Sequence, residues 1–311
     1  MAYGSGKYSY ELVENWAKLP EGGTFRDVCG MSIDPQKRIY VLNRSEHPVM
    51  VFDLEGNFIK SWGEGYFTRA HGSCINSDEF IYCTDDLNHT VTKFDLEGNA
   101  LMVLGTKDQP SKTGYKSGPD LFESIASITH GGSPFNRPTG VDISSEGDIF
   151  VSDGYGNARI HKFNGDGTLL FSWGEPGPAS SQFRLPHSLR VDRLDRIWLV
   201  DRENSRIQIF NKDGEFLTQW TNLFRPTDLW IDDEDIVYVS ELCRRVSIFT
   251  INGELLARWG NEGHDVSDPL FVAPHGIAVD SKGDLYVGEV SLTSANIDRG
   301  SRTIQKFSRI Q

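Results

Sequence analysis

The sequence has few cysteines, no long apolar run and no excess of basic residues. Its four cysteines, Cys29, Cys74, Cys83 and Cys243, form no CxxC pair, so we expect free thiols rather than a disulfide framework. No stretch approaches the roughly 18 apolar residues of a membrane span. The N-terminus also lacks the basic region and apolar run of a signal peptide. We therefore expect a cytoplasmic protein that does not bind a membrane.

The charge balance argues against one large class of partner. The chain carries 44 Asp and Glu against 31 Lys and Arg, a formal net charge of −13. Because nucleic-acid binding depends on clustered Lys and Arg that neutralise phosphates, we expect no nucleic-acid partner. The 7 Trp, 18 Phe and 10 Tyr are enough for a sizeable core, and a small-molecule substrate is the remaining expectation.

One unit recurs six times along the chain. The copies span residues 28–53, 70–95, 138–164, 186–211, 226–250, and 274–290 with 302–308. Each reads as a first strand ending in a polar residue, a turn, a second strand such as IYV, an acidic turn and a third strand ending in Phe. A fourth strand follows in most copies, as in NFIKSWGE. Four antiparallel strands repeated six times predict an all-β fold, a six-bladed β-propeller that forms a single domain over residues 1–311.

The last copy lacks a fourth strand of its own. The N-terminal segment YELVENWAKLPEG matches that strand, with Trp16 in the place that Trp62, Trp173 and Trp259 take in other copies. We therefore expect the N-terminal strand to complete the last blade and close the ring. Ring closure would remove the exposed sheet edges that an open array leaves.

A second irregularity is an insertion over residues 106–135, TKDQPSKTGYKSGPDLFESIASITHGGSPF, which separates the second copy from the third. Connections of this length without regular structure are uncommon in compact domains and are often functional. One interpretation is a lid or rim loop near the site. The other is a passive surface excursion.

Histidine recurs at one position of the repeat. Five residues before the polar residue that closes the first strand, the copies carry Cys29, His71, Thr139, His187, Thr227 and His275. The start of the innermost strand borders a propeller's central channel, so the three histidines of alternate copies are expected to converge. Three neutral imidazoles with an open fourth position make a catalytic zinc site, although iron, manganese or cobalt would also fit. Three unrelated turn histidines are the alternative.

Two arginines and a tyrosine complete the candidate site. Arg44 in VLNRSE and Arg202 in VDRENS follow second strands at equivalent places. A guanidinium at a channel mouth is suited to bind a carboxylate or an oxyanion, and a salt bridge between blades is the alternative. Tyr155 in SDGYGNARI lies in the same region. A tyrosine beside a metal and guanidinium groups is suited to act as a base. The alternative is a tyrosine that only packs in the core.

The remaining histidines and a set of acidic residues carry weaker signals. We expect solvated surface positions for His47, His89, His130, His161 and His264. His89 and His130 could in addition reach a bound substrate. An acidic residue ends the second strand in nearly every copy, and this recurrence indicates a structural role in the turns for Asp85, Asp153, Asp201, Glu241 and Glu289.

Together these motifs resemble the NHL-repeat propellers, and among them the peptidyl-α-hydroxyglycine α-amidating lyases, the lyase half of the peptide-amidating enzyme. The resemblance is most specific in FNRPTGVDI with IFVSDGYGNARIHKF, in LPHSLRVD with VDRENSRIQIF, and in APHGIAVD. By the matching motifs it implies zinc on His71, His187 and His275, a catalytic tyrosine at Tyr155, and active-site arginines at Arg44 and Arg202.

The resemblance also implies a reaction, the cleavage of a carbinolamide C–N bond to give an amide and glyoxylate. Tyr155 would remove the proton of the substrate's hydroxyl group, and the arginines would hold the phenolate or the leaving carboxylate. Some positions depart from the family. Ala273 replaces a methionine, and Gly276 replaces an acidic residue that helps to bind a structural calcium, so that calcium is doubtful. Gly156 and Ile209 replace cysteines, so the family's disulfides are not expected.

Two other functions remain open. The same metal could activate a water molecule, which would make the protein a hydrolase of a small amide, ester or lactone. A calcium-dependent lactonase fits less well, because calcium prefers oxygen ligands to imidazoles. Many NHL propellers are instead non-enzymatic interaction modules for proteins or RNA. The acidity of the chain and the alternating histidines favour an enzyme.

Overall fold

The fold is built almost entirely from antiparallel sheets. The computed structural model describes residues 1–260 and 269–310. They divide into two compact units, Met1–Glu64 with Pro226–Gln311, and Gly65–Arg225. Each unit holds three sheets formed from copies of the repeat. These six sheets confirm the all-β, six-bladed propeller, whereas a single domain over residues 1–311 stays a prediction.

The unit Gly65–Arg225 contains three four-stranded sheets in chain order. Their strands are β7 (Ala70–Ile75), β8 (Phe80–Asp85), β9 (Thr90–Asp95) and β10 (Ala100–Gly105); β11 (Pro138–Ile143), β12 (Ile149–Asp153), β13 (Arg159–Phe163) and β14 (Leu169–Trp173); and β17 (Pro186–Val191), β18 (Ile197–Asp201), β19 (Arg206–Phe210) and β20 (Phe216–Trp220). A short parallel pair, β15 (Glu175–Pro176) and β16 (Gln182–Phe183), follows β14. The helices are α1 (Leu121–Ala126) and the 3-10 turn η1 (Arg202–Asn204).

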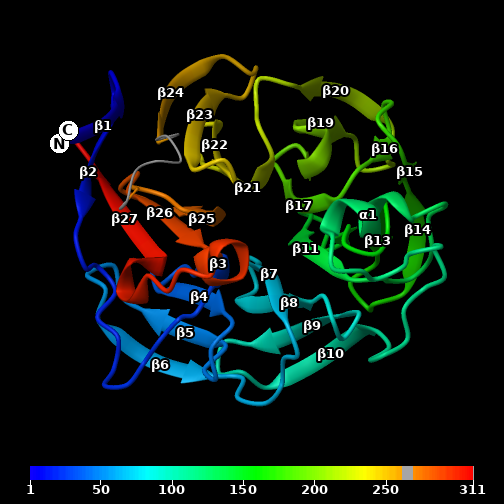
Figure 1. Cartoon of the computed structure of the whole chain (residues 1–311), viewed down its shortest axis with the longest axis horizontal. Helices are drawn as coiled ribbons and strands as arrows, with labels where there is room; N and C mark the ends of the chain where they lie inside the picture. The colour runs from blue at the N-terminus through cyan, green and yellow to red at the C-terminus, as the bar shows by residue number, and fades with distance from the viewer. Residues whose placement is uncertain (261–268, 311) are drawn as a thin grey trace. The chain divides into compact units, whose positions relative to one another are not determined.

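The other unit contains two four-stranded sheets and one sheet of five strands. Their strands are β3 (Val28–Ile33), β4 (Ile39–Asn43), β5 (Val49–Phe52) and β6 (Phe58–Trp62); β21 (Pro226–Ile231), β22 (Ile236–Glu241), β23 (Arg245–Thr250) and β24 (Leu255–Gly260); and β1 (Ala2–Ser5), β2 (Tyr8–Val13), β27 (Ile304–Arg309), β26 (Leu285–Glu289) and β25 (Pro274–Val279). Its helices are α2 (Ser291–Ala295) and the 3-10 turn η2 (Gly300–Thr303). β2 pairs with β27, so the N-terminal strand completes the last blade as predicted (Figure 1).

Two details of this closing sheet differ from the prediction. The strand ends at Val13, because the chain turns at Asn15, which has a left-handed φ of 52°. Trp16 therefore lies beyond the strand and does not take the place of Trp62. Its buried ring packs against two other aromatic rings, and its indole N–H donates to the carbonyl of Leu54 at 3.0 Å. In addition, β1 folds back onto β2 and adds an unpredicted fifth strand.

The burial of the strands explains why the repeat forms stacked sheets. The second strand of each copy is buried along almost its whole length, as in β12 and β18. The fourth strands are partly exposed, as in β20. Strands covered on both faces need apolar residues at consecutive positions, whereas outer strands need them only on one face. Phe150 of β12 and Leu189 of β17 share one buried cluster, which joins two adjacent sheets of their unit.

The recurring acidic residues fix the loops that lead into the inner strands. Asp85 accepts hydrogen bonds from the backbone N–H groups of Thr68 at 2.6 Å and Arg69 at 3.1 Å. Asp201 accepts one from Arg184 at 2.7 Å. The same link, from the end of a second strand to the loop before an inner strand, is made by Asp153 and Glu289. The structural role expected for these four carboxylates is therefore confirmed. The fifth, Glu241, accepts hydrogen bonds from Arg245 and Ser247 of the third strand.

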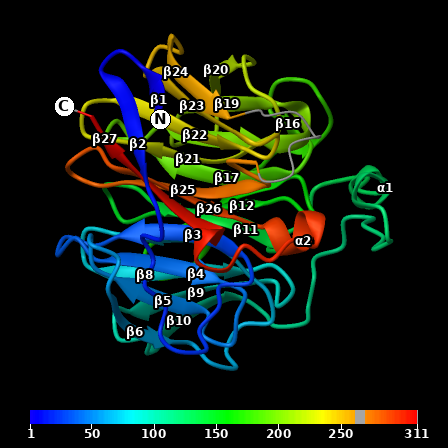
Figure 2. The same ribbon diagram turned by 60° about the vertical axis from the view of Figure 1, so that its left-hand side comes forward.

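The insertion over residues 106–135 carries the short helix α1. The carboxylate of Asp120 caps this helix by accepting a hydrogen bond from the backbone N–H of Glu123 at 2.8 Å. Figure 2 shows α1 and its flanking loops projecting from the strands of their unit. Among the described residues, no helix is both long and apolar enough to cross a lipid bilayer. The four cysteines are free thiols, as predicted.

Candidate functional site

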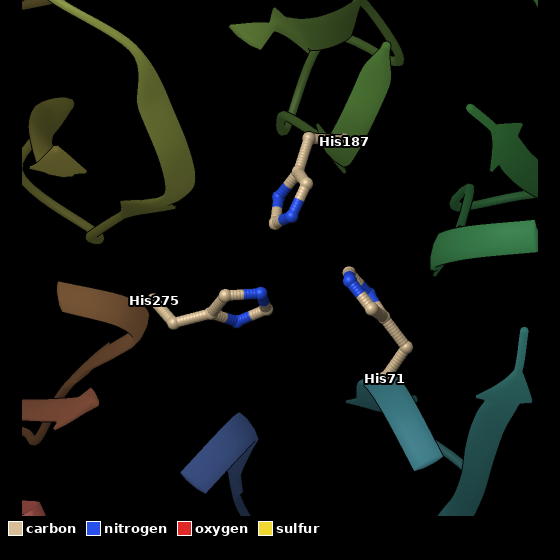
Figure 3. A group of neighbouring side chains, drawn as sticks. All are labelled: His71, His187 and His275. Carbon is tan, nitrogen blue, oxygen red and sulfur yellow. The ribbon is translucent and has the colours of Figure 1, made fainter. Parts of the chain in front are cut away.

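Two of the predicted metal ligands face each other in the unit Gly65–Arg225. His71 and His187 are each the second residue of an inner strand, β7 and β17, and each is buried. Their ring centroids lie 4.7 Å apart. Figure 3 shows the two rings directed toward one another from the starts of these strands. The repeat therefore brings together imidazoles that are far apart in the sequence.

Backbone carbonyls orient the imidazoles. The Nδ1 atom of His71 lies 2.6 Å from the carbonyl oxygen of Thr139. Since that oxygen can only accept, Nδ1 carries the proton and Nε2 keeps its lone pair. In the other unit, His275 on β25 makes the same kind of bond, with Nδ1 2.8 Å from the carbonyl oxygen of Cys29. Both imidazoles therefore offer Nε2 to a ligand, a typical arrangement for metal-binding histidines.

A glycine allows the bond between His71 and Thr139. A Cβ atom at Gly72 would lie only 2.4 Å from the Thr139 carbonyl oxygen. Any other residue would therefore force β7 away from β11 and lengthen the bond that orients the imidazole. The glycine of the HG pair thus has a structural reason to follow this histidine.

Tyr155 lies between these two histidines in the same unit. Its hydroxyl oxygen is 3.3 Å from Nε2 of His71 and 3.4 Å from Nε2 of His187. The Nη1 atom of Arg202 donates to the same oxygen at 3.4 Å. The structure thus places three of the predicted site residues around the phenolic oxygen of a fourth.

Arg202 is held in place by a buried carboxylate. Its side chain is only 3% exposed, and its Nε atom lies 2.8 Å from Oε1 of Glu203. Burial alone would lower the pKa of the Arg202 guanidinium, but Tyr155 and Glu203 outweigh burial and raise it. Burial would raise the pKa of Glu203, but Arg202 and Arg225 outweigh burial and lower it. Arg202 therefore stays cationic beside the phenol.

Arg44 occupies the equivalent place in the other unit. The backbone N–H of Arg44 donates to the carbonyl of Asp27 at 3.0 Å, just as that of Arg202 donates to Leu185 at 3.1 Å. The Arg44 guanidinium lies 3.4 Å from the Asp27 carboxylate and 3.1 Å from the hydroxyl of Thr293. The equivalence inferred from the repeat is thereby confirmed, and a catalytic role for Arg44 stays a prediction.

The two predicted substrate-binding histidines differ in their surroundings. His89 is partly buried, and its Nδ1 accepts a hydrogen bond from the backbone N–H of Arg137 at 3.1 Å. Burial lowers the pKa of His89, and the nearby Arg137 guanidinium also disfavours its cationic form. His130 is exposed on the insertion, where its Nδ1 lies 3.0 Å from the hydroxyl of Thr129. Contact of either histidine with a substrate stays a prediction.

The surface position expected for His161 is wrong. Its side chain is fully buried, with Nδ1 2.7 Å from the hydroxyl of Ser172 and Nε2 3.3 Å from the Asp153 carboxylate. The third strand is covered on both faces, so a polar residue there requires buried partners. His47 is exposed, as expected, and lies 2.7 Å from Glu64. His264 lies outside the described residues.

Two further arginines flank Tyr155. The guanidinium carbons of Arg69 and Arg137 lie 5.3 and 5.2 Å from the centre of the Tyr155 ring. Neither arginine was predicted from the sequence, although Arg69 lies two residues before His71 and Arg137 two residues before Thr139. A comparison of that earlier position across the copies would have found them.

The insertion contacts this site from within the same unit. Ile125 of α1 shares a small buried cluster with Tyr155 and Leu185. The hydroxyl of Tyr115 accepts a hydrogen bond from Nη1 of Arg137 at 2.7 Å. The insertion therefore packs against the residues around Tyr155, and its action as a lid stays a prediction.

A cavity of about 710 Å³ lies beneath α1. Its walls include Phe122, Ile125, Pro176, Phe183, Arg184 and Leu185. Ile125 and Leu185 also pack against Tyr155, so this cavity borders the cluster on which the phenol rests. Its volume falls in the range of small-molecule sites.

Comparisons with known proteins agree with these features. The family model of the NHL repeat matches residues 135–163 and 183–210. NHL repeat-containing protein 3 of Homo sapiens is 29% identical over 97% of this chain and 84% of its own length. Peptidyl-alpha-hydroxyglycine alpha-amidating lyase 1 of Drosophila melanogaster is 38% identical, over 29% of this chain and 19% of its own length. A solved streptogramin B lyase structure aligns with a TM-score of 0.60 and 16% identity, over 99% of this chain and 90% of that chain.

Proposed function

We propose that this chain, which carries NHL repeats and is homologous to amidating lyase domains, is a metal-dependent lyase. Its substrate would be an α-hydroxyglycine amide or a related small carbinolamide that bears a carboxylate. One observation carries the proposal: the Tyr155 hydroxyl lies within 3.4 Å of two buried imidazole nitrogens and a buried guanidinium. A base, metal ligands and an anion-binding group are the parts that this reaction requires.

The donor set fits a zinc ion. His71 and His187 of one unit, together with His275 of the other, would hold it through their Nε2 atoms. The bonds from Nδ1 to Thr139 and Cys29 leave Nε2 unprotonated in two of the three residues. Three neutral imidazoles are a common ligand set for catalytic zinc. When bound, the ion would supply Lewis-acid polarisation of the substrate's oxygen.

Side chains of this protein would remove the proton of the carbinol and neutralise the carboxylate of the substrate. Tyr155 takes the proton of the carbinol hydroxyl group as that oxygen forms a carbonyl. The C–N bond breaks, its electron pair goes to the amide nitrogen, and the nitrogen takes up one proton. The products are an amide and glyoxylate, with no water consumed. Arg202, with Arg44 of the other unit, neutralises the carboxylate that leaves as part of glyoxylate.

α-Hydroxyhippurate tests the proposal, because its products identify the reaction. The proposed lyase converts it to benzamide and glyoxylate. A hydrolase would instead release benzoate, so a benzoate product would replace the lyase with the metal hydrolase. Metal-loaded protein that produces neither benzamide nor benzoate would contradict both.

The metal site has its own control. Elemental analysis of protein prepared without chelators is expected to find about one first-row divalent metal per chain. His187→Ala is expected to lose most of this metal, whereas His47→Ala, at an exposed position, keeps it. Equal metal content in the two variants would contradict the assignment of His187.

A further inference from the structure

We propose that Arg69 and Arg137 form a second anion-binding subsite beside Tyr155, so that the preferred substrate carries a second anionic group in addition to its reacting carboxylate. The inference rests on the proposed function for the place of the reacting carboxylate. The subsite itself rests on contacts within the unit Gly65–Arg225.

The two arginines converge on Tyr155 from neighbouring loops. Arg69 precedes β7 and Arg137 precedes β11, and both guanidinium carbons lie within 5.3 Å of the centre of the Tyr155 ring. The left-handed backbone of Arg137, with φ of 69°, is held by the bond from its N–H to His89. The hydroxyl of Tyr115 holds the far end of the same side chain. Arg137 is thus fixed from both ends.

One carboxylate serves both guanidinium groups. Asp86 is fully buried, and its oxygens lie 3.6 Å from Nε of Arg69 and 3.8 Å from Nη2 of Arg137. Both separations exceed hydrogen-bond length. Among the described residues, Asp86 is the one carboxylate within 4.0 Å of these guanidinium groups, so the two cations share a single ion-pair partner. The pair therefore favours an anionic partner.

The N–H groups of this pair are available to such a partner. Among the residues that the structure describes, the Arg69 guanidinium makes no hydrogen bond, and the buried Nε of Arg137 has no partner. Their side chains are 25% and 13% exposed. Buried polar groups are normally paired, so unused donors beside a site indicate a ligand. A planar guanidinium fork matches carboxylate and phosphate geometry.

Arg202 takes a different anion. It is 3% exposed, it is held by Glu203, and it donates to the Tyr155 hydroxyl. Its place beside the phenolic oxygen suits the carboxylate of the reacting carbon. Arg69 and Arg137 lie against the ring of Tyr155, so the group that they bind belongs to another part of the substrate. We therefore place the second anionic group on the acyl half of the carbinolamide.

A matched pair of inert ligands tests the subsite apart from the reaction. Hippurate and 4-carboxyhippurate lack the reacting hydroxyl and differ by one carboxylate. Titration calorimetry of the metal-loaded full chain is expected to find 4-carboxyhippurate about 10- to 100-fold tighter, as for a charge-assisted hydrogen-bond pair. A 4-phosphono analogue distinguishes preference for phosphate from preference for carboxylate. Equal binding of all three ligands would overturn the subsite.

Variants assign the effect to the two arginines. The ratio of the affinity for 4-carboxyhippurate to the affinity for hippurate measures the contribution of the second carboxylate. Arg69→Gln and Arg137→Gln are each expected to lower this ratio about tenfold, and the corresponding Lys variants are expected to restore part of it. Arg196→Gln, at a turn distant in sequence and paired with Asp192, is the matched control and is expected to keep the ratio. An unchanged ratio in both Gln variants would overturn the proposal. Urea unfolding of each variant excludes loss of fold as the cause.

The hydroxylated forms of the same ligands separate this subsite from the lyase. A preference for 4-carboxyhippurate without turnover of either hydroxylated compound supports the subsite and contradicts the lyase. Turnover of both hydroxylated compounds with equal kcat/KM supports the lyase and contradicts the subsite. A higher kcat/KM for the dianionic compound, lost in Arg69→Gln, supports both.

Discussion

Replacement of Arg202 by Met would test the electrostatic design of the site. The substitution keeps an unbranched side chain but removes the contacts to Glu203 at 2.8 Å and to the Tyr155 hydroxyl at 3.4 Å. Removing one partner of a buried ion pair costs about 3–5 kcal/mol when the other charge is left unpaired. Glu203 keeps Arg225, at 2.8 and 3.0 Å. We therefore expect a smaller loss, about 1–3 kcal/mol in the free energy of unfolding at pH 7.

The loss should depend on pH with a defined sign. The two arginines hold the pKa of Glu203 below its usual 4.5 despite burial. A carboxylate with a lowered pKa in the folded state stabilises the fold above its unfolded pKa. That stabilisation disappears as the pH falls through the folded pKa. The difference between wild type and Arg202→Met should therefore be complete above about pH 5 and shrink in more acidic solution.

Urea unfolding from pH 7 down to about pH 3.5 measures this difference. Lys212→Met, which removes an exposed pair with Glu146, is the control and should leave the free energy of unfolding close to that of the wild type at every pH. Arg202→Met should also lower kcat/KM on α-hydroxyhippurate about 100- to 1,000-fold, the effect of removing a preorganised charged donor. Equal stability of Arg202→Met and wild type, with the same pH dependence, would refute this account of Arg202 and Glu203.

Four other substitutions have defined outcomes. Tyr155→Phe should keep the metal and lose about 100-fold or more in turnover, so a fully active variant would contradict the proposed base. His187→Ala should lose metal and activity together while the thermal transition persists, because each sheet pair supplies its own core. Trp16→Ala should cost about 3–5 kcal/mol in urea unfolding, because its buried ring packs against two aromatic rings. Tyr115→Phe frees one end of Arg137 and should raise KM for the dianionic substrate about three- to tenfold, with kcat unchanged.

The repeat made the fold and part of the site predictable from the sequence. Spacing along one copy fixes which residue begins the inner strand, and this position is the same in every copy. The meeting of His71 with His187 follows from that rule, although 116 residues separate them in the sequence. The place of Arg202 beside Tyr155 follows from the same rule. These predictions needed only the alignment of the copies, which puts equivalent residues at the same position of each sheet.

The features that escaped prediction depend on contacts that no local pattern encodes. The direction of the Arg137 side chain depends on a left-handed backbone and on Tyr115 of the insertion. Burial of His161 depends on Ser172 and Asp153, which lie on two other strands. β1 pairs with β2 through a turn that has no equivalent in the repeated unit. In each case the residue or strand that makes the contact cannot be identified from the spacing of the repeat.

The first, second, fourth and sixth copies share one backbone bond beside the site, while the side chains at three nearby positions vary among the copies. In the second copy these are Arg69, His71 and Asp86, where the backbone N–H of Asp86 donates to the Arg69 carbonyl at 3.1 Å. In the fourth copy the same bond joins Arg202 to Leu185. Between these two copies the cationic Arg69 gives way to Leu185 and the anionic Asp86 to Arg202, while the histidine and the backbone bond are kept.

A backbone bond does not depend on side-chain identity, so such exchanges leave the frame intact. The carboxylates of Asp85, Asp153, Asp201 and Glu289, which end second strands, likewise hold the loops by bonds from backbone N–H groups. Side chains at the site can therefore change without rebuilding the blade. The backbone bond thus lets an arginine stand at position 69, beside Tyr155, while His71 keeps its place in the inner strand.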